Sequence, residues 1–180
     1  MLKPKARWLA LLLLAQPAAA EVTMPALFQG GGVLQRDKLV PVWGRASAGK
    51  AVMVSFAGQN KTATADAAGR WQVSLDAMPA SSESRSMTVT EEGSAALELT
   101  DILVGEVWLG SGQSNMQWTV EASRPEDQAI AAAGPVPLMR LFDVPRVLNH
   151  SRQESVKAKW TAATPETAKP FSAVAYFFGK

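Results

Sequence analysis

The chain has 180 residues and a formal net charge of +2, from 18 basic and 16 acidic residues. No stretch interleaves basic with aromatic residues, which argues against a nucleic-acid partner. The chain contains no cysteine, so disulfides and thiolate zinc sites are excluded, and an apolar core has to stabilise the fold.

The first 20 residues, "MLKPKARWLALLLLAQPAAA", have the three parts of a secretory signal peptide. A basic start precedes a short apolar run, and small residues stand at alternate positions before a predicted cleavage after Ala20. The apolar run is too short to cross a bilayer, so we prefer a signal peptide to a membrane anchor or a buried helix. We expect an exported protein, periplasmic or extracellular, with no membrane anchor after cleavage. Loss of three basic residues would change the net charge from +2 to −1.

Residues 21–99 have the pattern of short strands separated by turns. "KLVPVWG", "AVMVSFAG" and "DAAGRWQVSL" each predict a strand, and "SMTVTEEGSAALEL" predicts a hairpin around Glu92. Pro41 predicts that the first of these strands lies at a sheet edge or contains a bulge. Alternation places Val52, Val54 and Phe56 on one face, and it places Trp71, Val73 and Leu75 on another. This spacing is typical of an antiparallel β-sandwich, for which we predict a structural or sugar-facing role because no titratable cluster occurs here.

Residues 100–180 have a different pattern. The nearly continuous apolar run "DILVGEVWLG" predicts a strand buried on both faces, as in a parallel sheet, that ends near Gly110. A helix over 126–133, a strand at "LMRLFDVP" and a polar loop at "NHSRQESVKAKWTAATPETAKP" follow. "FSAVAYFFGK" predicts a helix with Phe171, Val174 and Phe178 on one apolar stripe. These elements are the beginning of an α/β domain, and about 80 residues are too few to close a doubly wound sheet.

The stretch "GSGQSNM" follows the predicted strand and has two interpretations. A serine held on a sharp turn between strand and helix suits a nucleophile, because glycines at 110 and 112 let the backbone turn and the N–H groups of a following helix can face developing negative charge. Alternatively, Ser114 or Asn115 simply caps that helix, which both residue types do well. The chemistry of the motif alone leaves both interpretations open.

Larger segments carry a resemblance to a known family. "VGEVWLGSGQSNMQW" resembles the nucleophile block of the sialate O-acetylesterase family, a branch of the SGNH (GDSL-like) hydrolases that remove acetyl groups from sugars. "GGVLQRDKLVPVWGRASAGKAVMVSFAG" and "DAAGRWQVSLDAMPA" resemble the N-terminal β-domain of that family, and "PFSAVAYFFGK" is similar to the segment after the nucleophile. The resemblance implies that 100–180 is the incomplete start of a flavodoxin-like SGNH-hydrolase domain with a parallel sheet.

The resemblance also implies roles for single residues. Ser114 would be the catalytic nucleophile that forms an acetyl-enzyme, and Gly112, Gln113 and Asn115 would position it. Glu106 stands where the family usually has Asp, in "GDVW", and we expect a structural role for it. No metal or organic cofactor is implied, and the expected partner is an acetylated carbohydrate, either a sialic acid or another sugar.

Two further parts of the family pattern do not match this sequence. The family completes its site with Gly and Asn oxyanion donors and an Asp-x-x-His pair. The single histidine, His150, has Val147 three positions before it, so we interpret it as a loop residue rather than the base. We therefore expect an N-terminal portion that is nearly inactive by itself.

Alternatives to the esterase are a secreted, non-catalytic β-sandwich module that binds glycan or a partner, and a fragment without a function of its own. An Asp-x-x-His pair in a continuation of the reading frame would distinguish the esterase from both. Trp118 is interpreted either as a core residue, which we prefer, or as an exposed ring that stacks on a sugar.

Overall fold

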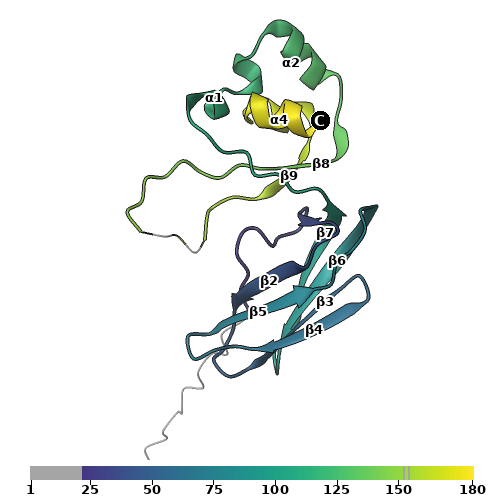
Figure 1. Ribbon diagram of the computed structural model, residues 1–180, viewed down its shortest axis with the longest axis vertical. Helices are drawn as coiled ribbons and strands as arrows, with labels where there is room; N and C mark the ends of the chain where they lie inside the picture. Colours follow the sequence, from purple (N-terminus) through teal and green to yellow (C-terminus); the bar gives the residue numbers. More distant parts are fainter. Residues whose placement is uncertain (1–21, 152, 154) are drawn as a thin grey trace, which may run out of the picture.

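The computed structural model describes residues 22–151, 153 and 155–180. The predicted signal peptide at 1–20 lies outside the described residues. Most strands lie together in one half of the molecule, and the helices gather with the last two strands in the other half (Figure 1).

The larger sheet has five strands in the order β1 (Val33–Gln35), β7 (Leu97–Gly105), β6 (Ser81–Glu91), β3 (Ala51–Phe56) and β4 (Gln59–Thr64). The pairs β7–β6, β6–β3 and β3–β4 are antiparallel, whereas β1 is parallel to β7. The sheet is therefore mixed, and the prediction of a purely antiparallel arrangement is wrong. The predicted hairpin is confirmed, since β6 and β7 are joined through a turn in which Gly93 has a φ of 84°.

A second, two-stranded sheet pairs β2 (Val40–Arg45) with β5 (Arg70–Leu75). Both sheets contribute to one apolar core. The predicted alternation is confirmed: Val52, Val54 and Phe56 are at most 2% exposed, and the inward residues of β5 are buried as well. Pro41 is exposed on β2, which has β5 as its one partner among the described strands. A proline tolerates this position because it leaves no ladder hydrogen bond unmade on the open side.

The other half contains the remaining elements: α1 (Ser114–Gln117), the 3-10 turn η1 (Val120–Ala122), α2 (Pro125–Ala132), β8 (Val136–Phe142), β9 (Trp160–Ala163), α3 (Pro165–Ala168) and α4 (Ala173–Gly179). The helix predicted over 126–133 and the strand at "LMRLFDVP" are confirmed as α2 and β8. The predicted loop, in contrast, contains β9 and α3. A proline at the first position of α3 and a reciprocal Thr164–Thr167 capping box were the sequence signals for that helix.

Two predictions about the packing of this half are wrong. First, β8 and β9 pair antiparallel, and no parallel pair of strands occurs in this half of the described chain. Second, α4 packs on a different face from the one expected. Ala173 and Tyr176 are buried in a second apolar cluster, whereas Val174 is 50% and Phe178 65% exposed. The apolar residues of this short helix point in several directions, so periodicity alone did not identify the buried face.

Strand β7 ends at Gly105, five residues before the predicted end. Beyond it Val107, Trp108 and Leu109 are 38%, 67% and 89% exposed. In the described part of the chain no strand pairs with this apolar stretch. Residues 106–113 therefore form a connection that carries the chain from the larger sheet to α1.

Polar contacts join the two halves. The Trp160 indole N–H donates to the Leu27 carbonyl at 2.9 Å, and the Gln29 side-chain amide donates to the Ala158 carbonyl at 3.2 Å. The Arg140 guanidinium lies 3.4 Å from the Asp101 carboxylate. No helix in the described ranges has the length and apolar character that a membrane span requires.

Candidate functional site

Ser114 is the first residue of α1, and its side chain is exposed. The N-cap position belongs to Gln113, which makes no side-chain capping bond within the described structure. Neither Ser114 nor Asn115 therefore caps the helix, and that interpretation is wrong. No hydrogen bond to the Ser114 hydroxyl is found among the residues described. The hydroxyl is therefore accessible, and no candidate base of the described chain lies within hydrogen-bond distance of it.

Glycines shape the approach to Ser114 by leaving room for Met116. A Cβ atom added at Gly112 would lie 2.7 Å from Met116 Cγ, and one added at Gly110 would lie 2.9 Å from Met116 Cε and 3.3 Å from Ala175 Cβ. Neither glycine has a positive φ. A left-handed backbone conformation is therefore not what requires glycine at these two positions. These glycines allow Met116 to fold back over the connection.

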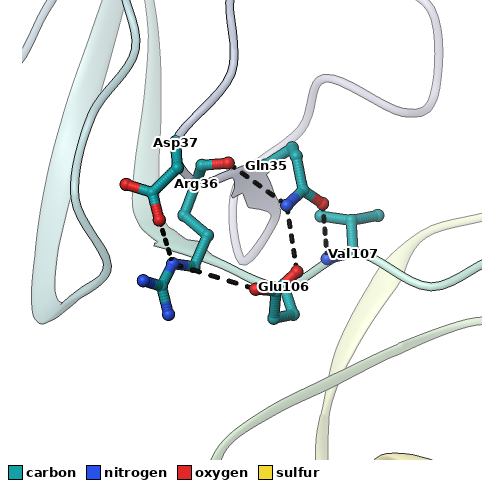
Figure 2. A network of polar contacts seen from close by, with 5 residues as sticks. All are labelled: Gln35, Arg36, Asp37, Glu106 and Val107. Carbon is teal, nitrogen blue, oxygen red and sulfur yellow. Dashed lines mark hydrogen bonds and ion pairs between the residues drawn. The ribbon is translucent and has the colours of Figure 1, made fainter.

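Glu106 stands at the exit of β7 in the polar network drawn in Figure 2. Its Oε2 accepts a hydrogen bond from Gln35 Nε2 at 3.0 Å, and its Oε1 lies 3.8 Å from Arg36 Nε. The same Gln35 side chain accepts from the Val107 backbone N–H at 2.9 Å. These contacts agree with the structural role expected for Glu106. Sequence analysis missed Gln35, although it lies in the family-like "VLQR".

The end of α1 packs against α4. The Ala173 N–H donates to the Trp118 carbonyl at 2.8 Å, and a β-bridge joins Thr119 to Ser172. Trp118 is 58% exposed, and its indole N–H donates to the Ala122 carbonyl at 2.7 Å. The preferred interpretation of Trp118 as a core residue is therefore wrong. The other interpretation, an exposed ring that could stack on a sugar, stays open, and the indole hydrogen bond to Ala122 fixes the orientation of this ring four residues after Ser114.

His150 is an exposed residue of the long connection between β8 and β9. Two carboxyl groups of the described residues have lowered pKa values, and both lie in local turns. A backbone N–H from Arg70 lowers the pKa of Asp66, and a hydrogen bond from the Thr164 side chain lowers the pKa of Glu166. Neither group is poised as a general base, so these pKa shifts mark local structure.

Ser114 does not line either of two cavities found in the described part of the chain. The larger of these two, about 280 Å³, lies at the end of β8 and includes Asp143, Lys159 and Phe171 in its walls. The described residues contain no group of three or more His, Asp or Glu side chains that could hold a metal ion.

No protein-family model matches the chain. Human sialate O-acetylesterase is 28% identical over 165 residues, which cover 82% of this chain and 32% of the human protein. The rat sialate O-acetylesterase is 31% identical over 121 residues, covering 62% of this chain and 22% of the rat protein. A crystal structure of a carbohydrate acetylesterase from Xanthomonas citri superposes with a TM-score of 0.81 at 40% identity. That superposition covers 88% of this chain and 36% of the bacterial protein. The chain spans about a third of the length of the human and bacterial relatives.

Proposed function

Since the chain belongs to a sialate O-acetylesterase-like family, we propose that it carries the nucleophile of an exported serine esterase that removes acetyl groups from carbohydrates. The observation that supports this most is the position of Ser114. It is exposed at the first residue of α1, after a glycine-containing connection from the larger sheet. A nucleophile needs this combination of a fixed backbone and an accessible hydroxyl.

The proposed reaction is a two-step acyl transfer. Ser114 Oγ attacks the acetyl carbonyl carbon while a base takes its proton, and a tetrahedral intermediate forms. The C–O bond to the sugar then breaks, and the sugar oxygen leaves with that proton. Water attacks the acetyl-Ser114 ester in the same way and releases acetate and the free serine. Gly112, Gln113 and Asn115 position the serine and are not themselves proton carriers in this proposal.

We further propose that the base and the remaining oxyanion donors belong to chain outside these 180 residues. Two observations support this. The Ser114 hydroxyl has no hydrogen-bond partner in the described structure, and His150 lies in an exposed connection rather than in an Asp-x-x-His pair. The proposed organisation is a signal peptide at 1–20, a β-sandwich at 21–99 and the start of an SGNH-hydrolase domain at 100–180. Acetylated sialic acids and other acetylated sugars are the proposed substrates.

The first experiment compares the chain from residue 21 onward with its Ser114→Ala variant on a chromogenic acetyl ester. We expect little turnover from either, because a serine without its base retains at most a factor of roughly 10³ to 10⁴ over water. A turnover of about 1 s⁻¹ or more that the substitution abolishes would show that the described chain contains the base.

The second experiment supplies the missing parts. Residues 22–180 replace the equivalent segment of the Xanthomonas citri carbohydrate acetylesterase, whose fold matches this chain closely. We expect the chimera to hydrolyse acetyl esters and its Ser114→Ala variant to lose at least about 10³ of kcat. A folded chimera whose activity survives Ser114→Ala would refute the assignment of the nucleophile.

A further inference from the structure

The connection that leads from β7 to Ser114 is held at its beginning by one side chain. Gln35 is the last residue of β1, and in the parallel register it lies opposite Gly105, the last residue of β7. Beyond this pair no strand accepts the backbone of β7 in the described structure. The Gln35 side-chain carbonyl instead accepts the Val107 N–H at 2.9 Å, as a neighbouring strand would.

The other end of the Gln35 amide fixes its orientation. Its Nε2 donates to Glu106 Oε2 at 3.0 Å and to the Arg36 carbonyl at 3.2 Å. The Arg36 guanidinium is shared between Glu106, at 3.8 Å, and Asp37, at 2.6 Å. Figure 2 shows that these groups converge on the exit of β7. The amide carries both a donor and an acceptor, so one side chain donates to the carboxylate and accepts from the N–H at the same time.

From these contacts we propose that Gln35 is a positioning residue that, through Glu106 and Val107, fixes the direction in which the chain leaves β7 and so the place of Ser114. The inference rests on the proposed function for the meaning of Ser114. The connection has separate supports after Val107: the Trp108 ring meets the Phe178 ring at 5.1 Å, and Gly110 lies against Ala175. Between them, Leu109 is 89% exposed.

Because the network lies at the surface, its loss should alter the connection more than the global fold. The Glu106 side chain is 53% exposed and Arg36 is 41% exposed, and exposed ion pairs contribute little to stability. We therefore expect Gln35→Ala to shift the melting temperature by no more than about 4 °C. Its effect should appear in the order of residues 106–114.

The test uses a spin label at position 114. The chain has no cysteine, so Ser114→Cys provides a unique thiol for a nitroxide, and its electron paramagnetic resonance spectrum reports local motion without requiring esterase activity. Adding Gln35→Ala should shorten the rotational correlation time of this label by at least about twofold. A second probe at Thr62→Cys, an exposed position on β4, should not change. Lys61→Gln removes the exposed ion pair of Lys61 with Asp76 at 2.7 Å and is the matched control, which should leave the label at 114 unchanged.

A reciprocal exchange separates positioning from a general loss of structure. Gln35→Glu alone places two carboxylates together and should loosen the label at 114. Combined with Glu106→Gln, it recreates one amide-to-carboxylate bond and keeps an acceptor for the Val107 N–H, so the spectrum should return towards that of the unexchanged chain. This pair also decides the matter if Gln35→Ala fails to fold. An unchanged label in Gln35→Ala, a parallel change at position 62, or no recovery in the folded exchange variant would each overturn the proposal. An inactive chimera would refute the esterase and leave this result standing.

Discussion

Gly44 on β2 is a position where one methyl group should have a large effect. A Cβ atom there would overlap the Thr23 carbonyl oxygen and would lie 2.9 Å from Trp71 Cζ2 and 3.1 Å from Met24 Sδ. The first of these contacts is with backbone, which cannot rotate away. Thr23 and Arg45 are joined by two backbone hydrogen bonds of 2.8 and 2.9 Å, and this bridge has to open to admit the methyl group.

The size of the effect follows from these contacts. Two lost hydrogen bonds cost about 2 kcal/mol. Crowding of Trp71, which is 3% exposed, adds about 1–3 kcal/mol. Replacing glycine in a strand returns roughly 0.5–1 kcal/mol. We therefore expect Gly44→Ala to destabilise the chain by about 3 kcal/mol, a fall of about 10 °C in Tm for a chain of this length.

The assay is urea unfolding followed by tryptophan fluorescence, with two control substitutions. Gly105→Ala adds a methyl group that meets only Val33 Cγ1, at 3.5 Å, and should be nearly neutral. Gly58 has a φ of 78° with nothing within 4 Å, so Gly58→Ala measures backbone strain alone, about 1 kcal/mol. A Gly44→Ala variant no less stable than Gly58→Ala would refute the crowding argument.

Three further outcomes are expected. The Arg70 N–H lowers the pKa of Asp66 below 3.8, so the stability that this carboxylate contributes is present above pH 3.8 and is lost as the pH falls below that value. Asp66→Asn should therefore reduce the dependence of the unfolding free energy on pH in acid. An Asp66 carboxyl that titrates by NMR at or above pH 3.8 would contradict this. Trp160→Phe removes the 2.9 Å hydrogen bond to the Leu27 carbonyl and should lower the free energy of unfolding in urea by about 1 kcal/mol. An unchanged free energy of unfolding would mean that this bond does not stabilise the contact between the two halves. In the active chimera, Trp118→Leu should raise KM for an acetylated sugar about tenfold and leave kcat unchanged, because the exposed ring would no longer stack on the sugar. An unchanged KM would show that Trp118 does not contact the sugar.

The strands predicted best from the sequence are those with one face buried in the core and the other exposed. In β3 and β5 every second residue is apolar and buried, so a period of two is visible in the letters. The sequence pattern did not identify β1, which has only three residues. It also missed β4, whose sequence "QNKTAT" is polar, as suits a strand at the sheet edge with β3 as its one partner among the described strands. Short or edge strands are defined by their neighbours, and neighbours are not visible in a local pattern.

The same reason explains the mixed success at the candidate site. A helical turn at Ser114 could be predicted from the glycines and the small polar residues before it. The end of β7 could not, because "DILVGEVWLG" stays apolar after pairing stops at Gly105. The contact between Gln35 and Glu106 joins residues 71 positions apart, and only the β1–β7 pairing brings them together.

The central claim is that Ser114 forms an acetyl-enzyme. The most direct measurement is acid quenching of the chimera during turnover of an acetyl ester, followed by peptide mass spectrometry. We predict the added mass of one acetyl group on the peptide that contains Ser114, absent from Ser114→Ala and lost when substrate is exhausted. An active chimera that is acetylated at another residue, or whose Ser114→Ala variant accumulates the same acetylated peptide, would contradict the account.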